Sequence, residues 1–257
     1  MMTAILTIKN GRKVVNNGMH EEKVLLDEIQ LTINEGDFIT VLGGNGAGKS
    51  TLFNTIAGTL QLSQGGVYFK DQPITKLSEE ARALFLSRVF QDPKMGTAPR
   101  MTVAENLLLA QKRGEKRTLR LRQLKNQKEV FYKLCQEVGN GLEQHLDTPA
   151  GELSGGQRQA LSLLMATIKA PELLLLDEHT AALDPKTAKL LMELTNQRIT
   201  EQKLTCLMIT HRMEDALKYG NRLIVLQKGR IVKDLAKEEK QALSMNDLLH
   251  FFEEVID

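Results

Sequence analysis

The chain has 257 residues, of which 42 % are hydrophobic and 26 % are charged. This composition is that of an ordinary globular protein and excludes a disordered chain. A formal net charge of +2 excludes the protein-wide basic field of a typical nucleic-acid binder. The length predicts one large α/β domain, or a core with a substantial subdomain. Cys135 and Cys206 match no metal or redox spacing, so we expect inert thiols in a reducing compartment.

Membrane crossing and secretion are not expected from the sequence. No apolar run approaches the roughly 20 residues that a spanning helix needs. Residues 1–9 lack the basic start, long apolar stretch and small-residue cleavage site of a secretion signal. We therefore expect the chain to stay in the cytoplasm.

The first third of the chain is expected to form mainly strands, because its apolar runs are short, alternating or β-branched and are separated by Asn-Gly and Glu-Gly turns. The expected strands are residues 4–8, 29–33, 38–42, 67–69 and 87–90. Between them, residues 51–57 fit a helix that stops at Gly58.

The middle of the chain, from 92 to about 170, has helical patterns. Thr102 fits a helix N-cap, and Glu105 stands where the partner of a capping box belongs. A long polar helix is expected over about 118–137, before a glycine-rich break at 139–141. This block is expected to be an inserted subdomain.

Beyond Pro171 the pattern alternates between strands and helices. Expected strands are residues 173–176, 205–209 and 223–226, and expected helices are about 185–202 and 213–218. Strands separated by helices predict a largely parallel sheet.

Residues 43–50 match the phosphate-binding pattern G-x-x-x-x-G-K-[ST], between an expected strand and an expected helix. Glycines let consecutive backbone N–H groups face phosphate oxygens at a helix N-terminus. Lys49 would reach the terminal phosphates, and the Ser50 hydroxyl would bind Mg²⁺. A glycine-rich turn with a chance Lys-Ser is the alternative, which the flanking elements disfavour. The expected nucleotide contacts are Gly43, Asn45, Gly46, Ala47, Gly48, Lys49, Ser50 and Thr51.

Two acids, Asp177 and Glu178, follow the apolar run 173–176. Ligands of open α/β sheets bind beyond the carboxyl ends of strands. Asp177 is then expected to hold Mg²⁺, and Glu178 to orient or deprotonate the attacking water. An acidic pair after a strand is often a solvated loop, but the phosphate loop in the same chain favours the functional interpretation.

Residues 153–157 read Leu-Ser-Gly-Gly-Gln and precede a helical run at 158–169. This segment resembles the signature sequence of ATP-binding cassette (ABC) ATPases. Gln91 is similar to the Q-loop residue, residues 181–184 to the D-loop, and His211 to the switch histidine. Alone, each segment has a plain structural explanation, such as a helix cap or a buried histidine. Six motifs in family order identify the chain as a member.

The resemblance implies an α/β P-loop NTPase fold with a mostly parallel core sheet, an N-terminal antiparallel β subdomain and an inserted helical subdomain. The core would be 1–91 and 171–257, with the helical subdomain at about 92–170, all in one ATPase domain over 1–257. The implied catalytic residues are Glu178, His211 and Lys49. The implied metal ligands are Ser50, Gln91 and Asp177, and the implied cofactors are ATP and Mg²⁺.

In this family two copies pack head to tail, so that the signature of one closes over the ATP held by the other. The residues expected to do so are Ser154, Gly155, Gly156 and Gln157. ATP binding would then close the dimer and hydrolysis would open it.

The resemblance further implies the energy-coupling subunit of an ABC transporter, of the importer type, on the cytoplasmic face of the membrane. Its partners would be a second ATP-binding subunit, membrane permease subunits and an extracytoplasmic solute-binding protein, with no nucleic acid. Residues 101–107 and 178–184 resemble a subgroup paired with branched-chain amino-acid-type permeases, which favours a small solute such as an amino acid. The alternative is a soluble ABC ATPase of an assembly machine, as in iron–sulfur cluster biogenesis.

The sequence departs from the family pattern at two places. The family usually stacks an upstream aromatic residue on adenine, and residues 1–37 contain no Phe, Tyr or Trp. Val15, by its place after the first expected strand, or His20, by an ungapped count, would occupy that position, which predicts weak base discrimination. His179 stands where a proline usually follows the catalytic Glu, as a tolerated substitution or with a role in catalysis.

A basic segment at 112–128 holds eight Lys and Arg residues and one acid, Glu115. It is a solvated helix face or a surface for anionic lipid headgroups. Nucleic acid is less favoured because no aromatic residues interleave the charges.

Overall fold

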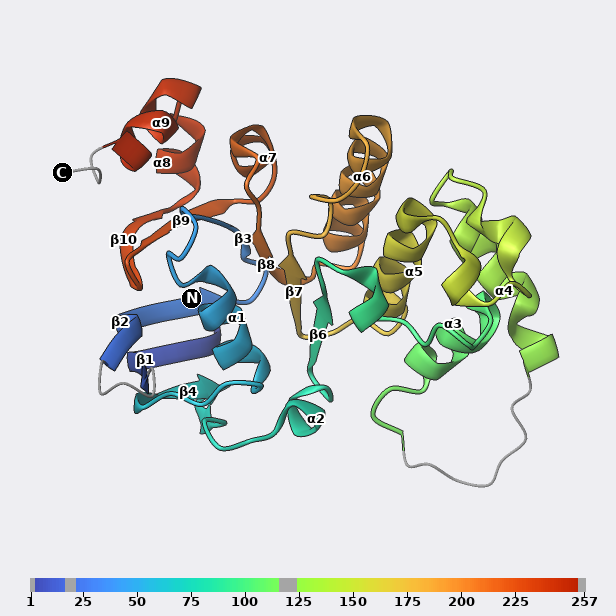
Figure 1. The fold of residues 1–257 in the computed structure, drawn as a ribbon, viewed down its shortest axis with the longest axis horizontal. Coiled ribbons are helices and arrows are strands. Elements are labelled where there is room, and N and C mark those ends of the chain that lie inside the picture. The colour runs from blue at the N-terminus through green and yellow to red at the C-terminus, as the bar shows by residue number, and fades with distance from the viewer. Residues whose placement is uncertain (1–2, 17–21, 116–123, 254–257) are drawn as a thin grey trace. The chain divides into compact units, whose positions relative to one another are not determined.

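The computed structural model describes residues 3–16, 22–115 and 124–253 (Figure 1). It divides into two compact units. Unit 1 comprises Met1–Arg82 and Leu204–Asp257, and unit 2 comprises Ala83–Lys203. The expected division into a core and a helical subdomain at about 92–170 stays a prediction. In the described part of the chain, no helix is long and apolar enough to span a membrane.

Unit 1 begins with an antiparallel sheet in the order β2-β1-β4-β5. Its strands are β1 (Ala4–Asn16), β2 (Glu22–Asn34), β4 (Gln64–Phe69) and β5 (Gln72–Pro73). β1 and β2 run well beyond the expected 4–8 and 29–33, because they continue as a paired ribbon with β-bulges. That extension is only partly buried, so it lacks the apolar alternation that marks a strand in a sequence.

A second set of strands in unit 1 has the order β10-β9-β3-β8. These are β3 (Phe38–Leu42), β8 (Thr205–Ile209), β9 (Arg222–Gln227) and β10 (Arg230–Leu235). β3 pairs in parallel with both β8 and β9, and β10 pairs antiparallel with β9. All residues of β3 and β8 are buried, which explains why both read as continuous apolar runs.

Helices of unit 1 complete its core. They are α1 (Lys49–Ala57), α2 (Glu79–Arg82), α7 (Met213–Lys218), α8 (Lys237–Gln241) and α9 (Met245–Glu253). Ala216 of α7 and Leu248 of α9 join Leu42, Leu223 and Val225 in one buried cluster. The sequence analysis missed α8, α9 and β10.

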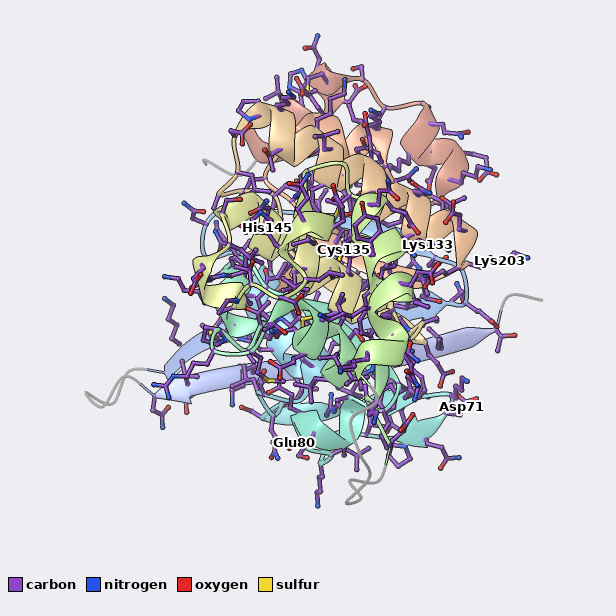
Figure 2. All side chains as sticks on the ribbon, turned by 90° about the vertical axis from the view of Figure 1, so that its right-hand side faces the viewer. Asp71, Glu80, Lys133, Cys135, His145 and Lys203 are labelled. Atoms are coloured by element: carbon purple, nitrogen blue, oxygen red, sulfur yellow. The ribbon has the colours of Figure 1, made fainter. Side chains whose placement is uncertain are left out.

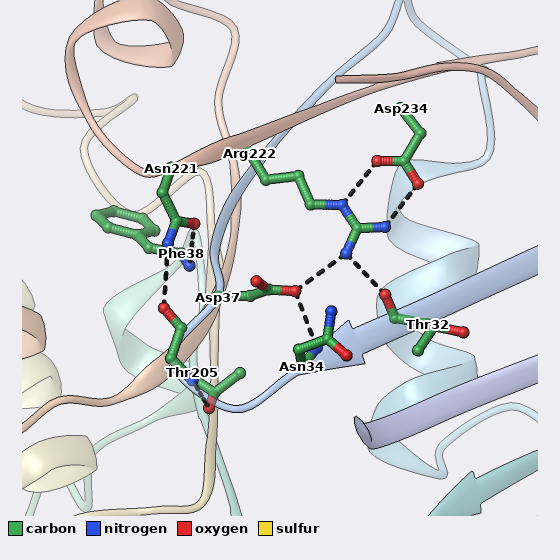
Figure 3. A network of polar contacts seen from close by, with 9 residues as sticks. Thr32, Asn34, Asp37, Phe38, Thr205, Asn221, Arg222 and Asp234 are labelled. Atoms are coloured by element: carbon green, nitrogen blue, oxygen red, sulfur yellow. Dashed lines mark hydrogen bonds and ion pairs between the residues drawn. The ribbon is translucent and has the colours of Figure 1, made fainter. Parts of the chain in front are cut away.

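Arg222, the first residue of β9, ties the ends of β2 and β10 to the residue before β3 (Figure 3). Its guanidinium donates to both carboxylate oxygens of Asp234, at 2.7 and 2.6 Å, and to Asp37 Oδ2 at 3.0 Å. It also donates to the Thr32 carbonyl at 2.8 Å. The hydrogen bond with Asp234 is the main cause that raises the pKa of Arg222. This network fixes the start of β3, which is the end of the strand away from Leu42.

Unit 2 holds two parallel strands, β6 (Leu86–Val89) and β7 (Leu173–Asp177). Its helices are α3 (Val103–Gln111), α4 (Leu124–Gln136), α5 (Gly155–Thr167) and α6 (Pro185–Glu201). Single 3₁₀ turns lie at Pro93–Met95, Leu142–His145 and Ala150–Glu152. The capping box of Thr102 and Glu105 is confirmed. Residues 116–123 of the basic segment, and with them the start of the expected helix 118–137, lie outside the described residues.

Each unit contains one buried cysteine: Cys206 in unit 1 and Cys135 in unit 2. Figure 2 shows Cys135 and Lys133 on α4. The Lys133 side chain is exposed, whereas Cys135 belongs to the core. Burial raises the pKa of the Cys135 thiol to about 12 and that of Cys206 well above its usual range.

Candidate active site

The loop between β3 and α1 leaves the sheet at Leu42 and enters the helix at Lys49. Its shape depends on Gly46 and Gly48, whose φ angles are +76° and +103°. Most side chains disfavour that left-handed region. Two backbone hydrogen bonds close the loop: Ala47 N–H donates to the Gly44 carbonyl at 3.2 Å, and Gly229 N–H donates to the Ala47 carbonyl at 2.9 Å.

The glycines of this loop have one packed side and one open side. A Cβ on Gly43 would lie 2.4 Å from the Leu226 carbonyl oxygen, and one on Gly48 would lie 2.8 Å from the Leu25 carbonyl oxygen. A Cβ on Gly44 would meet nothing within 4 Å. The loop is therefore pressed against strands β9 and β2 on one side and leaves room for a ligand on the other.

The N-terminus of α1 differs from those of α3, α5 and α6. Those three have side-chain caps from Thr102, Ser154 and Asp184. The N-cap of α1 is Gly48, with no side-chain cap and no acid in the first turn. Its backbone N–H groups and the positive end of the helix dipole favour an anion there.

The Lys49 side chain lies over the phosphate loop itself. Its Nζ donates to the carbonyls of Gly43 at 2.7 Å and Gly44 at 3.0 Å. Lys49 is only 6 % exposed, so its ammonium group is held against the carbonyls of this loop. Ser50, the next residue, is exposed at the start of the helix.

His211 follows β8 at the same sheet edge as the phosphate loop. Val41 of β3 is paired in parallel with Ile209 of β8, and Thr210 N–H donates to the Val41 carbonyl at 3.4 Å. Parallel neighbours end at one edge, so unit 1 brings His211 and the loop with Lys49 together. His211 is exposed.

Unit 2 brings Gln91 and Asp177 together in the same way, because Val89 of β6 is paired with Leu176 of β7. Asp177 is 9 % exposed, and its Oδ2 lies 2.5 Å from a guanidinium nitrogen of Arg88. The guanidinium carbon of Arg88 also lies 4.7 Å from the centre of the Phe90 ring. The sequence analysis missed Arg88, although an arginine within an apolar strand was the available signal.

Glu178 occupies a tight turn immediately after β7. Its φ of +46° is left-handed, and its carbonyl accepts a hydrogen bond from Ala181 N–H at 3.0 Å. The next residue, His179, is 2 % exposed and therefore does not lie on a solvated loop. Burial lowers the pKa of His179 to about 4.

The signature segment begins α5 with a capping box. The Ser154 hydroxyl accepts a hydrogen bond from Gln157 N–H at 3.3 Å, and the Gln157 side-chain oxygen accepts one from Ser154 N–H at 3.3 Å. A Cβ on Gly155 would meet nothing within 4 Å, whereas one on Gly156 would lie 2.5 Å from Thr187 Cγ2 of α6. Gly156 thus serves helix packing, and Gly155 leaves the end of α5 open.

The predicted site residues are divided between the units. Unit 1 holds Val15, the phosphate-loop residues 43–51 and His211, and unit 2 holds Gln91, the signature residues 154–157, Asp177 and Glu178. The sequence analysis expected Val15 to follow the first strand. Val15 instead lies within β1, opposite Lys23 of β2, because β1 continues to Asn16. His20 lies outside the described residues.

Metal chemistry at these residues would depend on few protein ligands. Among the residues described, no group of three or more His, Cys, Asp or Glu could hold a metal ion. The donors expected from the sequence are one hydroxyl, one amide and one carboxylate. All are hard oxygen donors, and few protein ligands are the rule where Mg²⁺ binds together with nucleotide phosphates.

Comparison with known proteins assigns this chain to one family. The family model described as "ABC transporter" matches residues 26–181. The chain is 43 % identical to a tyrosine transport ATP-binding protein of Clostridioides difficile, over 97 % of this chain and 99 % of that protein. It is 36 % identical to a thiamine import ATP-binding protein of Photobacterium profundum, over 84 % of each.

A solved structure of an ATP-binding cassette has a similar fold. A dimeric ATP-binding cassette in a post-hydrolysis state, bound to ADP and Pi, is 26 % identical. It superposes with a TM-score of 0.78 over 91 % of this chain and 99 % of that chain. The expected α/β fold, with an antiparallel sheet and a mostly parallel one, is confirmed. The chain therefore belongs to the ABC transporter family, and it is an ATP-binding cassette that acts as an ATPase.

Proposed function

We propose that this chain is the ATP-hydrolysing, energy-coupling subunit of an importer for a small solute such as an amino acid. The near full-length similarity to a tyrosine transport ATP-binding protein carries the transport part of the proposal. The open phosphate loop with its buried Lys49 supports the nucleotide part. The relatives are named for transport, which does not favour the alternative of an assembly machine.

In this proposal the backbone N–H groups of residues 43–51 and the Lys49 ammonium bind the phosphates. Ser50, Gln91 and Asp177 would hold Mg²⁺, which supplies positive charge to the phosphate oxygens. Glu178 orients the attacking water and accepts its proton. His211 acts on the terminal phosphate from the edge of unit 1.

The proposed assembly is a head-to-tail homodimer. Residues 154–157 of one copy would close over the ATP bound at Lys49 of the other. The open end of α5 at Gly155 supports this role, and the dimeric cassette of similar structure supports the pairing. The further partners would be permease subunits at the cytoplasmic face of the membrane and an extracytoplasmic solute-binding protein.

The test is Glu178→Gln, which keeps the size of the side chain and removes its basicity. We expect hydrolysis to fall by about 10²–10⁴-fold and ATP to hold a long-lived dimer, measured by light scattering. Undiminished turnover would refute the role of Glu178. Purification of the tagged chain in mild detergent tests the transport role: a soluble assembly complex in place of a permease would refute it.

A further inference from the structure

His179 makes a buried contact that the proposed mechanism does not use. Its Nε2 lies 2.9 Å from Thr195 Oγ1 on α6, and both residues are buried. The Thr195 hydroxyl in turn donates to the Leu191 carbonyl at 2.7 Å. Because that hydroxyl has a single proton, its oxygen must accept from the ring, so His179 carries its proton on Nε2. The contact therefore has a defined direction, from His179 to Thr195 to the backbone of α6.

The residue before His179 needs external support. Glu178 has a φ of +46°, a conformation that is disfavoured for a residue with a Cβ and persists only where the surroundings hold it. A proline at 179 would fix its own φ through its ring. Histidine provides no such covalent restraint, so non-covalent contacts must hold this turn.

We propose that His179 is a positioning residue, whose hydrogen bond to Thr195 holds the turn that aims the Glu178 carboxylate. The proposal rests on the proposed function, in which Glu178 is the base. β7 fixes the turn on one side, since Asp177 is its last residue. On the other side the histidine ring anchors the chain to α6. Thr180, the next residue, is buried as well.

The decisive variant is Thr195→Val, which keeps the shape of the side chain and removes the acceptor. Thr195→Ser is the matched control, because it keeps the hydroxyl. We expect Thr195→Val to lower kcat for ATP about tenfold, with KM within twofold of the original. Thr195→Ser should stay within twofold in both. His179→Leu should resemble Thr195→Val, and the double variant should be no worse than either single one, since both changes remove one interaction.

A second measurement does not depend on activity. The Ala181 N–H donates to the Glu178 carbonyl, so its hydrogen exchange reports the opening of the turn. Exchange at Ala181 should be at least tenfold faster in Thr195→Val than in Thr195→Ser. If the Thr195→Val chain does not fold, His179→Gln and His179→Leu form the test pair, because the glutamine amide supplies a donor near the position of Nε2.

The outcomes separate the two proposals. The positioning role is overturned if Thr195→Val leaves the hydrogen exchange at Ala181 or the kcat unchanged. It is also overturned if Thr195→Val and Thr195→Ser lose kcat and affinity equally. If Glu178→Gln abolishes turnover while Thr195→Val keeps it, the positioning role alone fails. If Glu178→Gln keeps turnover, the role of Glu178 as base fails first.

Discussion

At the scale of single residues, the charge of Asp177 at the buried end of β7 is balanced by Arg88 on the neighbouring strand. The position of Asp177 at the end of a buried strand was predictable from the apolar run before it, and its role at Mg²⁺ stays a prediction. Arg88 could have been noticed as an arginine within an apolar strand, but its ion pair with Asp177 could not be predicted, because it depends on the pairing of β6 with β7, which their sequences do not specify. His179 is similar: its partner Thr195 lies on α6, and only the fold brings the two together.

Replacing Arg88 by Met should leave Asp177 buried without its balancing charge. Loss of one partner of a buried pair costs about 3–5 kcal/mol, so we expect the free energy of unfolding in urea to fall by that order. The loss should shrink in the presence of Mg²⁺ and ATP, because a bound cation would compensate the carboxylate. Arg88→Lys, which retains a positive charge, is the control. Equal stability of the Met variant and the original chain would contradict this account.

Base discrimination is expected to be weak, since residues 1–37 lack an aromatic side chain. We expect GTP to be hydrolysed within about tenfold of the rate for ATP, an allowance of about 1.4 kcal/mol. Val15→Tyr should increase the binding preference for ATP, because stacking contributes about 1–3 kcal/mol. Val15→Leu is the matched control, and titration with fluorescent nucleotides is the measurement. A hundredfold ATP preference in the original chain would refute this expectation.

At the scale of elements, the short buried strands and the capped helices were predictable, and the ribbon of β1 and β2 was not. β3, β8 and α7 have the expected bounds, because burial on both faces or a clear amphipathic pattern marks them in the sequence. The far halves of β1 and β2 are held by their mutual pairing and by bulges. α8 escaped notice because Lys237–Gln241 contains no apolar residue. α9 was missed because the core contact of its Leu248 forms only once β3 and β9 provide a surface.

Arg82 secures the end of α1, the helix that starts at the phosphate loop. Its guanidinium donates to the carbonyls of Thr55 at 2.8 Å, Ile56 at 2.7 Å and Ile74 at 2.6 Å, and the residue is 1 % exposed. Arg82→Met would leave these carbonyls without their donor, at about 1–3 kcal/mol for each buried group that stays unsatisfied. We therefore expect the free energy of unfolding, measured by urea denaturation, to be lower in Arg82→Met by at least about 2 kcal/mol.

Arg82→Lys is the informative comparison, because one ammonium cannot reproduce the planar fork of guanidinium donors. We expect the Lys variant to lie between Met and Arg in stability. A Met variant as stable as the original chain would show that water or relaxation satisfies the carbonyls of α1 equally well.

At the scale of the whole molecule, each unit buries one thiol, which we expect to be unreactive while that unit stays folded. Both thiols are buried, and a raised pKa keeps the thiolate fraction of each small even at pH 9, so Cys135 and Cys206 of the folded protein should be alkylated far more slowly than a free thiol at both pH 7 and pH 9. In urea both should react as fast as a free thiol. In Cys135→Ala the remaining thiol is Cys206, which reports the unfolding of unit 1. In Cys206→Ala the remaining thiol is Cys135, which reports the unfolding of unit 2. Rapid labelling of either in the native protein would contradict the burial of its thiol.

During synthesis, strand β3 of unit 1 is made well before its neighbours β8 and β9. Phe38 is paired with Cys206 and Ile39 with Arg222, and all of unit 2 is translated between them. At about 5–20 residues per second, the apolar segment Phe38–Leu42 remains unpaired for roughly 10–30 s after it leaves the ribosome. The nascent chain can thus complete its second unit before its first, and newly made molecules are most prone to aggregate in that interval.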